Sequence, residues 1–383
     1  MIKRQKGYVL KRIEDTVYLL PYGQNIADQK RGLILNETGE FIWNYLEEEK
    51  TIEEITAGVA AYYEIADEEK EALAKDVDDF VNQLLGMGIL REELKEENQP
   101  FYHCMKIGGI CIKLCGPAEI FPEQFAPFFC GEDRADQTIE VKIAVPMNKP
   151  NGTVLIRNKE MSICEWEDGY LVLFHQMKNV IEAYMTKDGS YVRIYALMPQ
   201  TEEEKENLFH AIRLFYLYLA QRKGLYAIHS ASILYQDKAW LFSGHSGMGK
   251  STHTALWHEQ IHTPYLNGDL NLIGEEDGKL KVYGMPWCGT SGIYTTKTQD
   301  LGGIVLLGRD SRDHLEELGV AEKIVRVMQR MISPAWTKEQ MEVNLEFAER
   351  IAAKSQVYYL KCTKNPSAVA PIKSRIDQME AGR

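Results

Sequence analysis

The segment Gly244-His245-Ser246-Gly247-Met248-Gly249-Lys250-Ser251 decides the fold, because it fits the pattern G-x-x-x-x-G-K-[ST] at every specified position. Glycines let the backbone curl until successive N–H groups point at phosphate oxygens. The lysine of this pattern reaches the β- and γ-phosphates of a nucleotide, and the final hydroxyl binds Mg²⁺. The segment therefore predicts a phosphate-binding loop.

The residues on either side of the loop fit this interpretation. Residues 239–243 are a short apolar run suited to a buried strand, and residues 251–258 carry apolar residues at helical spacing. A strand, a glycine-rich loop and a helix in this order place the positive end of the helix dipole beside the phosphates. The expected nucleotide-binding residues are Gly244, His245, Ser246, Gly247, Met248, Gly249, Lys250, Ser251 and Thr252.

A second pattern overlaps the end of this helix. The segment His258-Glu259-Gln260-Ile261-His262 fits H-E-x-x-H, in which two histidines one helical turn apart bind zinc. Zinc binding needs both histidines inside a stable helix and a further ligand from elsewhere. The candidates for that ligand are His229, Asp269 and Glu275. His262 comes two residues before Pro264, where the helix is expected to end. Zinc binding therefore stays an alternative.

Length, charge and cysteine content limit the classes of function. A chain of 383 residues suffices for two or three domains, each with its own core. The formal net charge of −12 argues against nucleic-acid binding, which needs clustered Lys and Arg. We find no signal peptide and no apolar stretch long enough to span a membrane. The seven cysteines contain no C-x-x-C pair, which favours buried thiols in a cytoplasmic protein.

The N-terminal part of the chain has the pattern of a small α+β unit. Strands are expected over residues 8–12, 17–20 and 32–35. Asn36 is the expected N-cap of a first helix, and Thr51 and Glu54 form a capping box for a second. Asp67 is expected to cap a third helix, which stops at Gly88. Three short strands and three helices predict a winged-helix-like domain.

This stretch resembles the PqqD family, whose members recognise peptides in the biosynthesis of ribosomally made, post-translationally modified peptides. The resemblance rests on Leu-Asn-Glu-Thr-Gly-Glu-Phe-Ile-Trp at 35–43, Thr-Ile-Glu-Glu-Ile at 51–55, Asp-Val-Asp-Asp-Phe-Val at 76–81 and Gly-Met-Gly-Ile-Leu at 86–90. It covers nearly all of residues 5–93. In that family an extended leader peptide adds a strand to the edge of the sheet, in a groove floored by the last helix.

The resemblance therefore implies a groove for a leader peptide. By position, its residues would be Gly32, Leu33, Ile34 and Leu35 on the sheet, and Val77, Val81 and Leu84 on the last helix. The alternative for these side chains is that they form the core of the domain. A winged helix would otherwise suggest DNA binding, but the acidic run at residues 76–79 argues against contact with phosphates. The expected partner is a precursor peptide, with neither nucleic acid nor membrane.

The middle of the chain is rich in strand patterns. Alternating apolar residues predict strands over 105–114, 138–143, 152–156, 170–174 and 191–195, which suggest an antiparallel layer. Residues 208–225 have the pattern of a long amphipathic helix, and the polar segment 94–100 ends in proline. The expected organisation is a peptide-recognition domain over 1–95, a mostly β part over 101–200 and a nucleotide-binding core over 201–383.

From about residue 102 to residue 362 the chain resembles the HPr kinase-like branch of P-loop proteins, whose core is also similar to that of phosphoenolpyruvate (PEP) carboxykinase. The resemblance rests on Ile-His-Ser-Ala-Ser at 228–232, the glycine-rich loop, Leu-Asn-Gly-Asp at 266–269 and Gly-Met-Pro-Trp-Cys-Gly-Thr-Ser-Gly at 284–292. It implies an α/β fold class: a winged-helix-like α+β domain followed by a P-loop kinase domain of the HPr kinase and PEP carboxykinase-like type.

This resemblance also implies roles for single residues. Lys250 would clamp the phosphates of ATP, and Ser251 and Asp269 would bind Mg²⁺. Family members usually have two adjacent acids at this position, whereas this chain has Gly268 before Asp269. Either Asp269 combines both roles through water, or His229 accepts the proton, or transfer is feeble. The alternative for His229 is a buried histidine bonded to a loop carbonyl.

These patterns together predict a cytoplasmic, ATP- and Mg²⁺-dependent kinase. Its expected substrate is a side chain, Ser or Thr, of a ribosomally synthesised precursor peptide held through its leader. HPr itself is not the expected substrate, since the acceptor-recognition loop of HPr kinases is absent. The first alternative is a non-catalytic, nucleotide-gated peptide carrier, and the second is a zinc peptidase. Family kinases often assemble into oligomers, so a homo-oligomer is compatible with this prediction.

Overall fold

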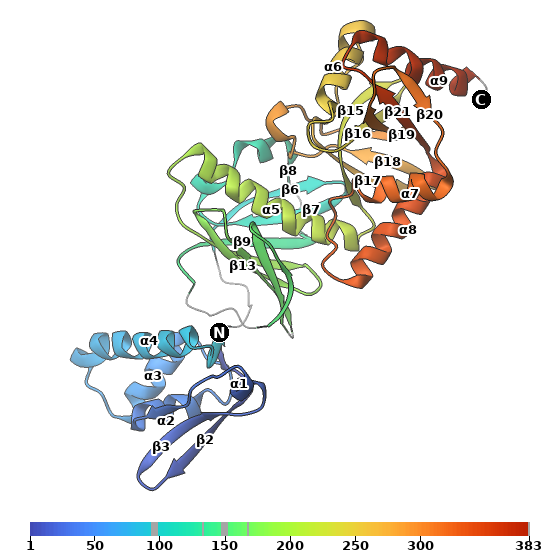
Figure 1. Cartoon of the computed structure of the whole chain (residues 1–383). Coiled ribbons are helices and arrows are strands. Elements are labelled where there is room, and N and C mark those ends of the chain that lie inside the picture. The colour runs from blue at the N-terminus through green and yellow to red at the C-terminus, as the bar shows by residue number, and fades with distance from the viewer. Residues whose placement is uncertain (93–98, 132–133, 147–151, 167, 382–383) are drawn as a thin grey trace.

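Three parts follow one another along the chain (Figure 1): helices and strands at the N-terminus, a large central sheet, and an α/β part at the C-terminus. The computed structural model describes residues 1–92, 99–131, 134–146, 152–166 and 168–381. Of the expected boundary segment 94–100, residues 94–98 lie outside the described residues. The buried apolar side chains of residues 2–90 form a cluster of their own, which is distinct from those of the rest of the chain.

The N-terminal part contains the three predicted strands and the three predicted helices. The strands β2 (Tyr8–Ile13), β3 (Thr16–Pro21) and β4 (Leu33–Leu35) form an antiparallel sheet in that order. The helices are α2 (Glu37–Tyr45), α3 (Ile52–Tyr62) and α4 (Lys70–Gly86). Elements that the sequence analysis missed are α1 (Gln24–Ala27) and the antiparallel pair β1 (Ile2–Arg4) and β5 (Leu90–Glu92).

Local side-chain bonds explain where two of these helices begin. The Asn36 side chain accepts a hydrogen bond from the N–H of Gly39, and Thr51 and Glu54 form the predicted capping box. The predicted cap at Asp67 is wrong. Asp67 opens a short 3₁₀ turn, η1 (Asp67–Glu69), and its carboxylate pairs with Lys70 at 2.5 Å instead of capping the helix that begins there.

The central sheet has nine strands, and it is mixed instead of purely antiparallel. Their order is β10 (Thr153–Arg157), β11 (Met161–Glu165), β12 (Gly169–Phe174), β13 (Val180–Thr186), β14 (Tyr191–Ala196), β9 (Gln137–Ile143), β7 (Ile110–Cys115), β6 (Phe101–Ile107) and β8 (Phe129–Cys130). Strand β9 pairs in parallel with both β14 and β7. The single strand predicted over 105–114 is a hairpin, because Gly108 and Gly109 turn the chain with φ of 55° and 81°.

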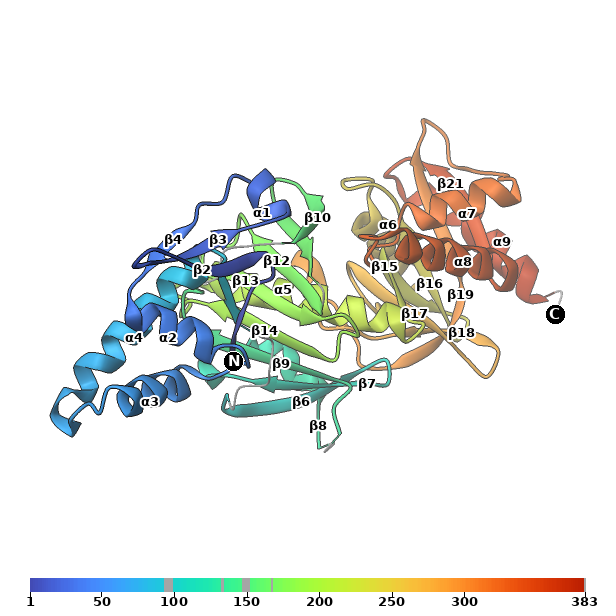
Figure 2. The same ribbon diagram turned by 90° about the horizontal axis from the view of Figure 1, so that it is seen from below.

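Helix α5 (Glu202–Arg222) links this sheet to the C-terminal part. Both views show it lying along one face of the sheet and reaching the C-terminal strands (Figures 1 and 2). Its buried residues share one apolar cluster with the central strands and with residues of the C-terminal part, among them Leu272 and Trp287. The helix begins six residues before the predicted start at 208 and carries charged residues in its first turn. The packing therefore fixes α5 between the two sheets.

The C-terminal part is a seven-stranded sheet covered by helices on both faces. The order of its strands is β16 (Lys238–Ser243), β15 (Tyr226–Tyr235), β17 (Leu270–Glu276), β18 (Lys279–Tyr283), β19 (Thr298–Arg309), β21 (Gln356–Cys362) and β20 (His314–Glu316), and β16 also pairs in parallel with β19. Helices α6 (Lys250–Ile261) and α9 (Val369–Ala381) share one apolar cluster with these strands, and α7 (Val320–Met328) and α8 (Lys338–Lys354) share another.

None of the helices in the described residues combines the length and the apolar character needed to cross a lipid bilayer.

A buried acid lies where the N-terminal part meets the central sheet. Glu182 on β13 is 3% exposed, and its carboxylate accepts a hydrogen bond of 2.6 Å from the hydroxyl of Tyr184. Nearby, Glu92 accepts a bond of 2.7 Å from the hydroxyl of Tyr195. Burial raises the pKa of Glu182 from 4.5 to about 7, the bond from Tyr184 opposes this shift, and the charge of Glu92 adds to it.

We expect the stability of the protein to fall as pH rises from 4.5 through 7, because the folded state prefers protonated Glu182 and the unfolded state does not. The loss attributable to this one group is about 3 kcal/mol at most. Glu182→Gln, which stays neutral, should match the wild type at pH 5 and exceed its free energy of unfolding at pH 8. Denaturant unfolding at both pH values measures this. Equal pH dependence in the variant and the wild type would contradict it, and exposed Glu203→Gln is the control.

Candidate functional site

The glycine-rich loop connects β16, which ends at Ser243, to α6, which begins at Lys250. Gly247 and Gly249 have φ of 72° and 98°, a backbone conformation that other residues rarely adopt. A Cβ on Gly247 would meet no heavy atom within 4 Å, so the space beside the loop is open. Gly249 provides no side-chain cap to α6, whose first-turn N–H groups therefore need another partner. The local geometry fits an anion at the start of α6.

Two strands bring Asp269 and His229 together opposite this loop. His229 lies on β15 and pairs with Leu270 of the neighbouring antiparallel strand β17, directly after Asp269. The His229 Nε2 and Asp269 Oδ1 atoms are 2.9 Å apart. The side chains keep 32% and 37% of their area exposed, so that a ligand can contact both. Of the sequence-predicted residues, His229 and Asp269 are thus in contact, and the charge of Lys250 acts on Asp269.

Charges around Asp269 decide its protonation state. The hydrogen bond with His229 lowers the pKa of Asp269, burial opposes this shift, and the nearby charges of His229, Lys250 and Arg213 lower it further. Burial lowers the pKa of Lys250, the charge of Asp269 opposes this, and the charge of Arg330 adds to it. At neutral pH the site therefore holds one carboxylate beside several cations, in a chain whose formal charge is −12.

Position 268, directly before Asp269, is sterically closed in this chain. A Cβ on Gly268 would lie 1.8 Å from the Oγ of Ser291 and 2.7 Å from its Cβ. Ser291 belongs to the short turn η4 (Gly289–Ser291), and its hydroxyl donates a 2.6 Å hydrogen bond to the carbonyl of Cys288. Any side chain at position 268 would displace this turn. Of positions 268 and 269, only 269 therefore carries a carboxylate.

Three arginines that the sequence did not predict also act on this part of the molecule. Arg330 follows α7: its guanidinium nitrogens lie 3.0 and 2.8 Å from the ring nitrogens of His245, and its carbonyl accepts a bond of 2.9 Å from the N–H of His229. Arg309 donates a bond of 2.7 Å to the carbonyl of Gly247. Arg213, on α5, acts electrostatically on Asp269. These arginines come from separate elements and carry no sequence motif, so the sequence alone offers no signal for them.

The H-E-x-x-H segment does not form a metal-binding helix. Helix α6 ends at Ile261, and His262 follows in the left-handed conformation with φ of 57°. The Nδ1 atom of His258 bonds the carbonyl of Thr263 at 2.9 Å, and its ring stacks on Tyr265 with centroids 4.7 Å apart. Within the described ranges, no three His, Cys, Asp or Glu side chains gather closely enough to share a metal ion. The geometry gives the zinc alternative no support.

The predicted leader groove divides into an exposed edge and buried side chains. Strand β4 is at the edge of its sheet, and Ile34 on it is 68% exposed. Val77, Val81 and Leu84 are at most 2% exposed, and with Leu35 they belong to the core of the domain. As the alternative interpretation held, these four side chains do not line an open groove. The partly buried apolar residues of α4 are Leu73 and Phe80, and Met87, directly after the helix, is also partly buried.

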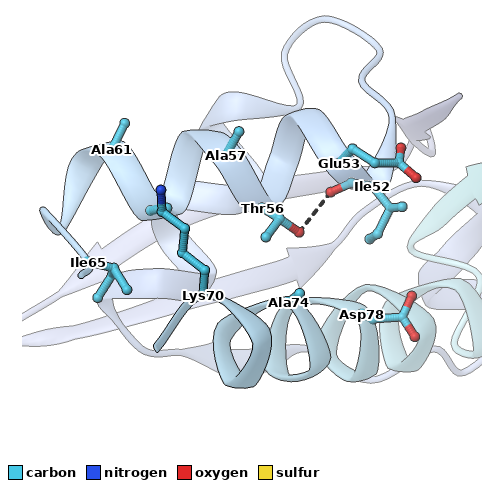
Figure 3. A pocket seen from close by; sticks show the side chains of 10 residues that line it. Ile52, Glu53, Thr56, Ala57, Ala61, Ile65, Lys70, Ala74 and Asp78 are labelled. Carbon is cyan, nitrogen blue, oxygen red and sulfur yellow. Dashed lines mark hydrogen bonds between the residues drawn. The ribbon is translucent and has the colours of Figure 1, made fainter. Parts of the chain in front are cut away.

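A second candidate for peptide binding lies between α3 and α4 (Figure 3), where a cavity of about 690 Å³ opens. Its walls carry small side chains of α3, such as Ala57 and Ala61, and the charged side chains of Lys70 and Asp78 on α4. Because these alanine side chains are small, space remains between the two helices. The cavity could not be predicted from the sequence, because its residues also fit the pattern of exposed helix faces.

Comparisons with known proteins characterise the N-terminal part. Residues 26–90 match the family model described as Coenzyme PQQ synthesis protein D (PqqD), and this stretch is a PqqD-type domain. The solved structure "TbiB1 in Complex with the TbiA(beta) Leader Peptide" is 27% identical and aligns with 24% of this chain and 99% of its own, at a TM-score of 0.20. The Hpr(Ser) kinase/phosphatase from Coxiella burnetii is 8% identical, with 41% and 95% covered and a TM-score of 0.25. No curated protein matches the chain.

Proposed function

We propose that the chain is an ATP- and Mg²⁺-dependent kinase that phosphorylates a Ser or Thr side chain of a ribosomally synthesised precursor peptide, which its N-terminal domain holds by the leader. The observation that carries the proposal is the His229–Asp269 pair opposite Lys250, at a glycine-rich loop between a strand and a helix. The PqqD-type domain on the same chain supports a peptide as the substrate.

The glycine-rich loop is the donor side of this site. Its open space beside Gly247, the uncapped start of α6 and the ammonium of Lys250 suit the β- and γ-phosphates of ATP. The hydroxyl of Ser251 and the carboxylate of Asp269 would hold Mg²⁺, because this ion prefers oxygen ligands. The ion would supply neutralisation of the phosphate charge. The excess of cations over carboxylates at the site fits a polyanionic substrate.

Asp269 marks the side of the site where the hydroxyl that receives the phosphoryl group would bind. Since several interactions lower its pKa, its carboxylate is ionised at neutral pH and can accept the proton of an incoming hydroxyl. The bond of 2.9 Å to His229 holds the carboxylate in one orientation. In this arrangement one acid takes the place of two, because the turn around Ser291 leaves no room for a side chain at Gly268. Catalysis then consists mainly of positioning and charge neutralisation.

The fusion of a peptide-recognition domain to a kinase domain has a physical benefit. A leader held on the N-terminal domain keeps the acceptor residue near Asp269, and a short flexible tether gives an effective concentration of about 1 mM. A weak acceptor site then suffices, so the kinase domain needs few contacts with the residue that it modifies.

Incubation of the protein with ATP, Mg²⁺ and the precursor peptide encoded beside its gene tests the proposal. A mass gain of one phosphoryl group on the peptide, located by fragmentation on Ser or Thr, is the expected result. Tight binding of peptide and nucleotide without any mass gain would contradict the kinase and favour the nucleotide-gated carrier. Peptide cleavage would contradict both.

Ile34→Glu should weaken leader binding about 10-fold, because the edge strand would lose an exposed apolar contact of roughly 1.4 kcal/mol. Fluorescence anisotropy of a labelled leader measures the Kd. Ile13→Glu is the matched control, since Ile13 is 55% exposed at the other end of the same sheet. Ala57→Trp, which fills the cavity between α3 and α4, should leave the Kd unchanged. A loss of binding in Ala57→Trp with a normal Ile34→Glu would place the leader between the helices instead.

A further inference from the structure

A cavity of about 680 Å³ opens where the first turns of α5 meet the central sheet. Four aromatic side chains line it: Tyr102, Phe121, Phe209 and Tyr294. The rings of Tyr102 and Phe121 are stacked, with centroids 4.6 Å apart, and both phenylalanines are buried. The packing of these rings therefore gives the cavity fixed aromatic walls, which the proposed function has not yet used.

Carboxylates from three separate elements also line this cavity. Glu119 comes from the 3₁₀ turn η2 (Ala118–Ile120), Glu123 from the 3₁₀ helix η3 (Glu123–Phe128), and Glu202 and Glu206 from α5. Among the described residues of the lining, Lys205 is the single cation, and it donates a hydrogen bond of 2.9 Å to Glu202. Within the part of the chain that the structure describes, the other three carboxylates form no ion pair.

The helix dipole accounts for only part of this acidity. Carboxylates in the first turn stabilise the N-terminus of a helix, and Glu202 is of this kind. Glu206 lies in the second turn, and the remaining two carboxylates belong to other elements. Carboxylates that gather around one cavity give it a negative potential, which attracts a cation. The aromatic walls add to this attraction, because the face of a ring also binds cations.

The cavity lies beside the candidate site, because one loop borders both. The N–H of Gly268, directly before Asp269, donates a hydrogen bond of 2.8 Å to the carbonyl of Ile293. The next residue in the chain, Tyr294, lines the cavity. The Cα atoms of Asp269 and Tyr294 are therefore about 15 Å apart at most, because one hydrogen bond and two peptide steps of about 3.8 Å each join them.

We propose that this cavity is a specificity subsite for a Lys or Arg side chain of the precursor peptide, within about four residues of the phosphorylated Ser or Thr. The inference rests on the proposed kinase function. An extended chain advances about 3.4 Å per residue, so about four residues span the distance between Asp269 and Tyr294. The apolar stem of the side chain packs on the aromatic rings, while its cationic end meets the carboxylates.

Such a subsite answers a need that the leader cannot meet. The leader tether brings every hydroxyl of the core peptide near the site at about 1 mM, without choosing among them. A cation close to one hydroxyl, held by the cavity, selects that residue for phosphorylation over the others.

Variants of the precursor peptide encoded beside the gene test this inference. They carry Lys, Gln or Glu at each of the four positions on either side of the phosphorylated residue, and kcat/KM is measured with ATP and Mg²⁺. Lys at one or two of these positions should raise kcat/KM about 10-fold over Gln, and Glu there should lower it. The preference should weaken as salt is added. Equal values for the three residues at every position would overturn this inference alone, whereas no phosphorylation of any peptide would overturn the proposed function as well.

Charge reversal in the cavity separates recognition from folding. The double variant Glu123→Lys, Glu206→Lys should prefer Glu to Lys at the same peptide position, a gain that a damaged fold would not produce. Glu203→Lys is the matched control, since Glu203 is exposed on the same helix and is not among the residues that line the cavity. It should keep the preference of the wild type. A double variant that still prefers Lys would place the cation on another surface and overturn the subsite.

Discussion

Replacing Lys250 by alanine should lower the rate of phosphoryl transfer about 10³-fold, with the affinity for the leader peptide unchanged. The ammonium lies at the start of α6, beside the loop and within electrostatic range of Asp269, and burial strengthens its field. Its removal takes away charge neutralisation at the phosphates. Leader binding should persist because the PqqD-type domain has its own apolar core.

Single-turnover transfer from radiolabelled ATP and leader anisotropy on the same preparation measure both quantities. Lys279→Ala is the matched control, since Lys279 is exposed at the start of β18. An unchanged transfer rate in Lys250→Ala would remove the kinase hypothesis. A parallel loss of leader affinity would show that the domains fold or bind as one unit, against the separate cores that the structure describes.

The sequence predicted those elements whose signals are local. Asn36 and the Thr51–Glu54 capping box mark helix starts through bonds that span three residues, and both are present. Asp67 failed as a cap because an ion pair with Lys70, equally local, competes for its carboxylate. The mixed central sheet was not predicted, since alternation along a strand is the same whether its neighbour is parallel or antiparallel.

In the candidate site, too, the features with local signals could be predicted and those set by tertiary packing could not. The loop and its flanking strand and helix could be predicted, because the pattern is contiguous. Asp269 and His229 came from resemblance to a family, and strand register explains why they meet. Arg213 and Arg330 reach the site only through tertiary packing of α5 and of the segment after α7, and an isolated arginine carries no sequence signal.

The glycine at position 268 also has a structural consequence that the sequence could not provide. Gly268 in place of an acid suggests weakened catalysis when the sequence is considered alone. In the structure, the Oγ of Ser291 occupies the space that a Cβ at this position would need, and the turn that carries it packs over Asp269. The glycine at 268 and the close approach of the turn therefore go together, and introducing an acid at 268 would disturb Asp269.

Asp269→Asn should lower the rate of phosphoryl transfer about 10⁴-fold, the upper range for loss of a general base. The substitution removes both the proton acceptor and a charged ligand for Mg²⁺. Affinity for ADP without Mg²⁺ should change little. Asp277→Asn, in the exposed β17–β18 hairpin, is the matched control for the chemical change. Wild-type activity in Asp269→Asn would contradict any role of this carboxylate in the reaction.

The pH dependence of kcat decides between Asp269 and His229 as the proton acceptor. The bond from His229 and the nearby cations hold the pKa of Asp269 below its ordinary value of 3.8, so an Asp269 base stays ionised throughout pH 5 to 8 and adds no acid limb there. A histidine base must be neutral to accept the proton, so it would instead add an acid limb to the profile. We expect a flat acid side and a residual rate in His229→Gln that exceeds that of Asp269→Asn at least about 10-fold, because the imidazole only orients the carboxylate across 2.9 Å. A limb near neutrality that disappears in His229→Gln would assign the proton transfer to the histidine.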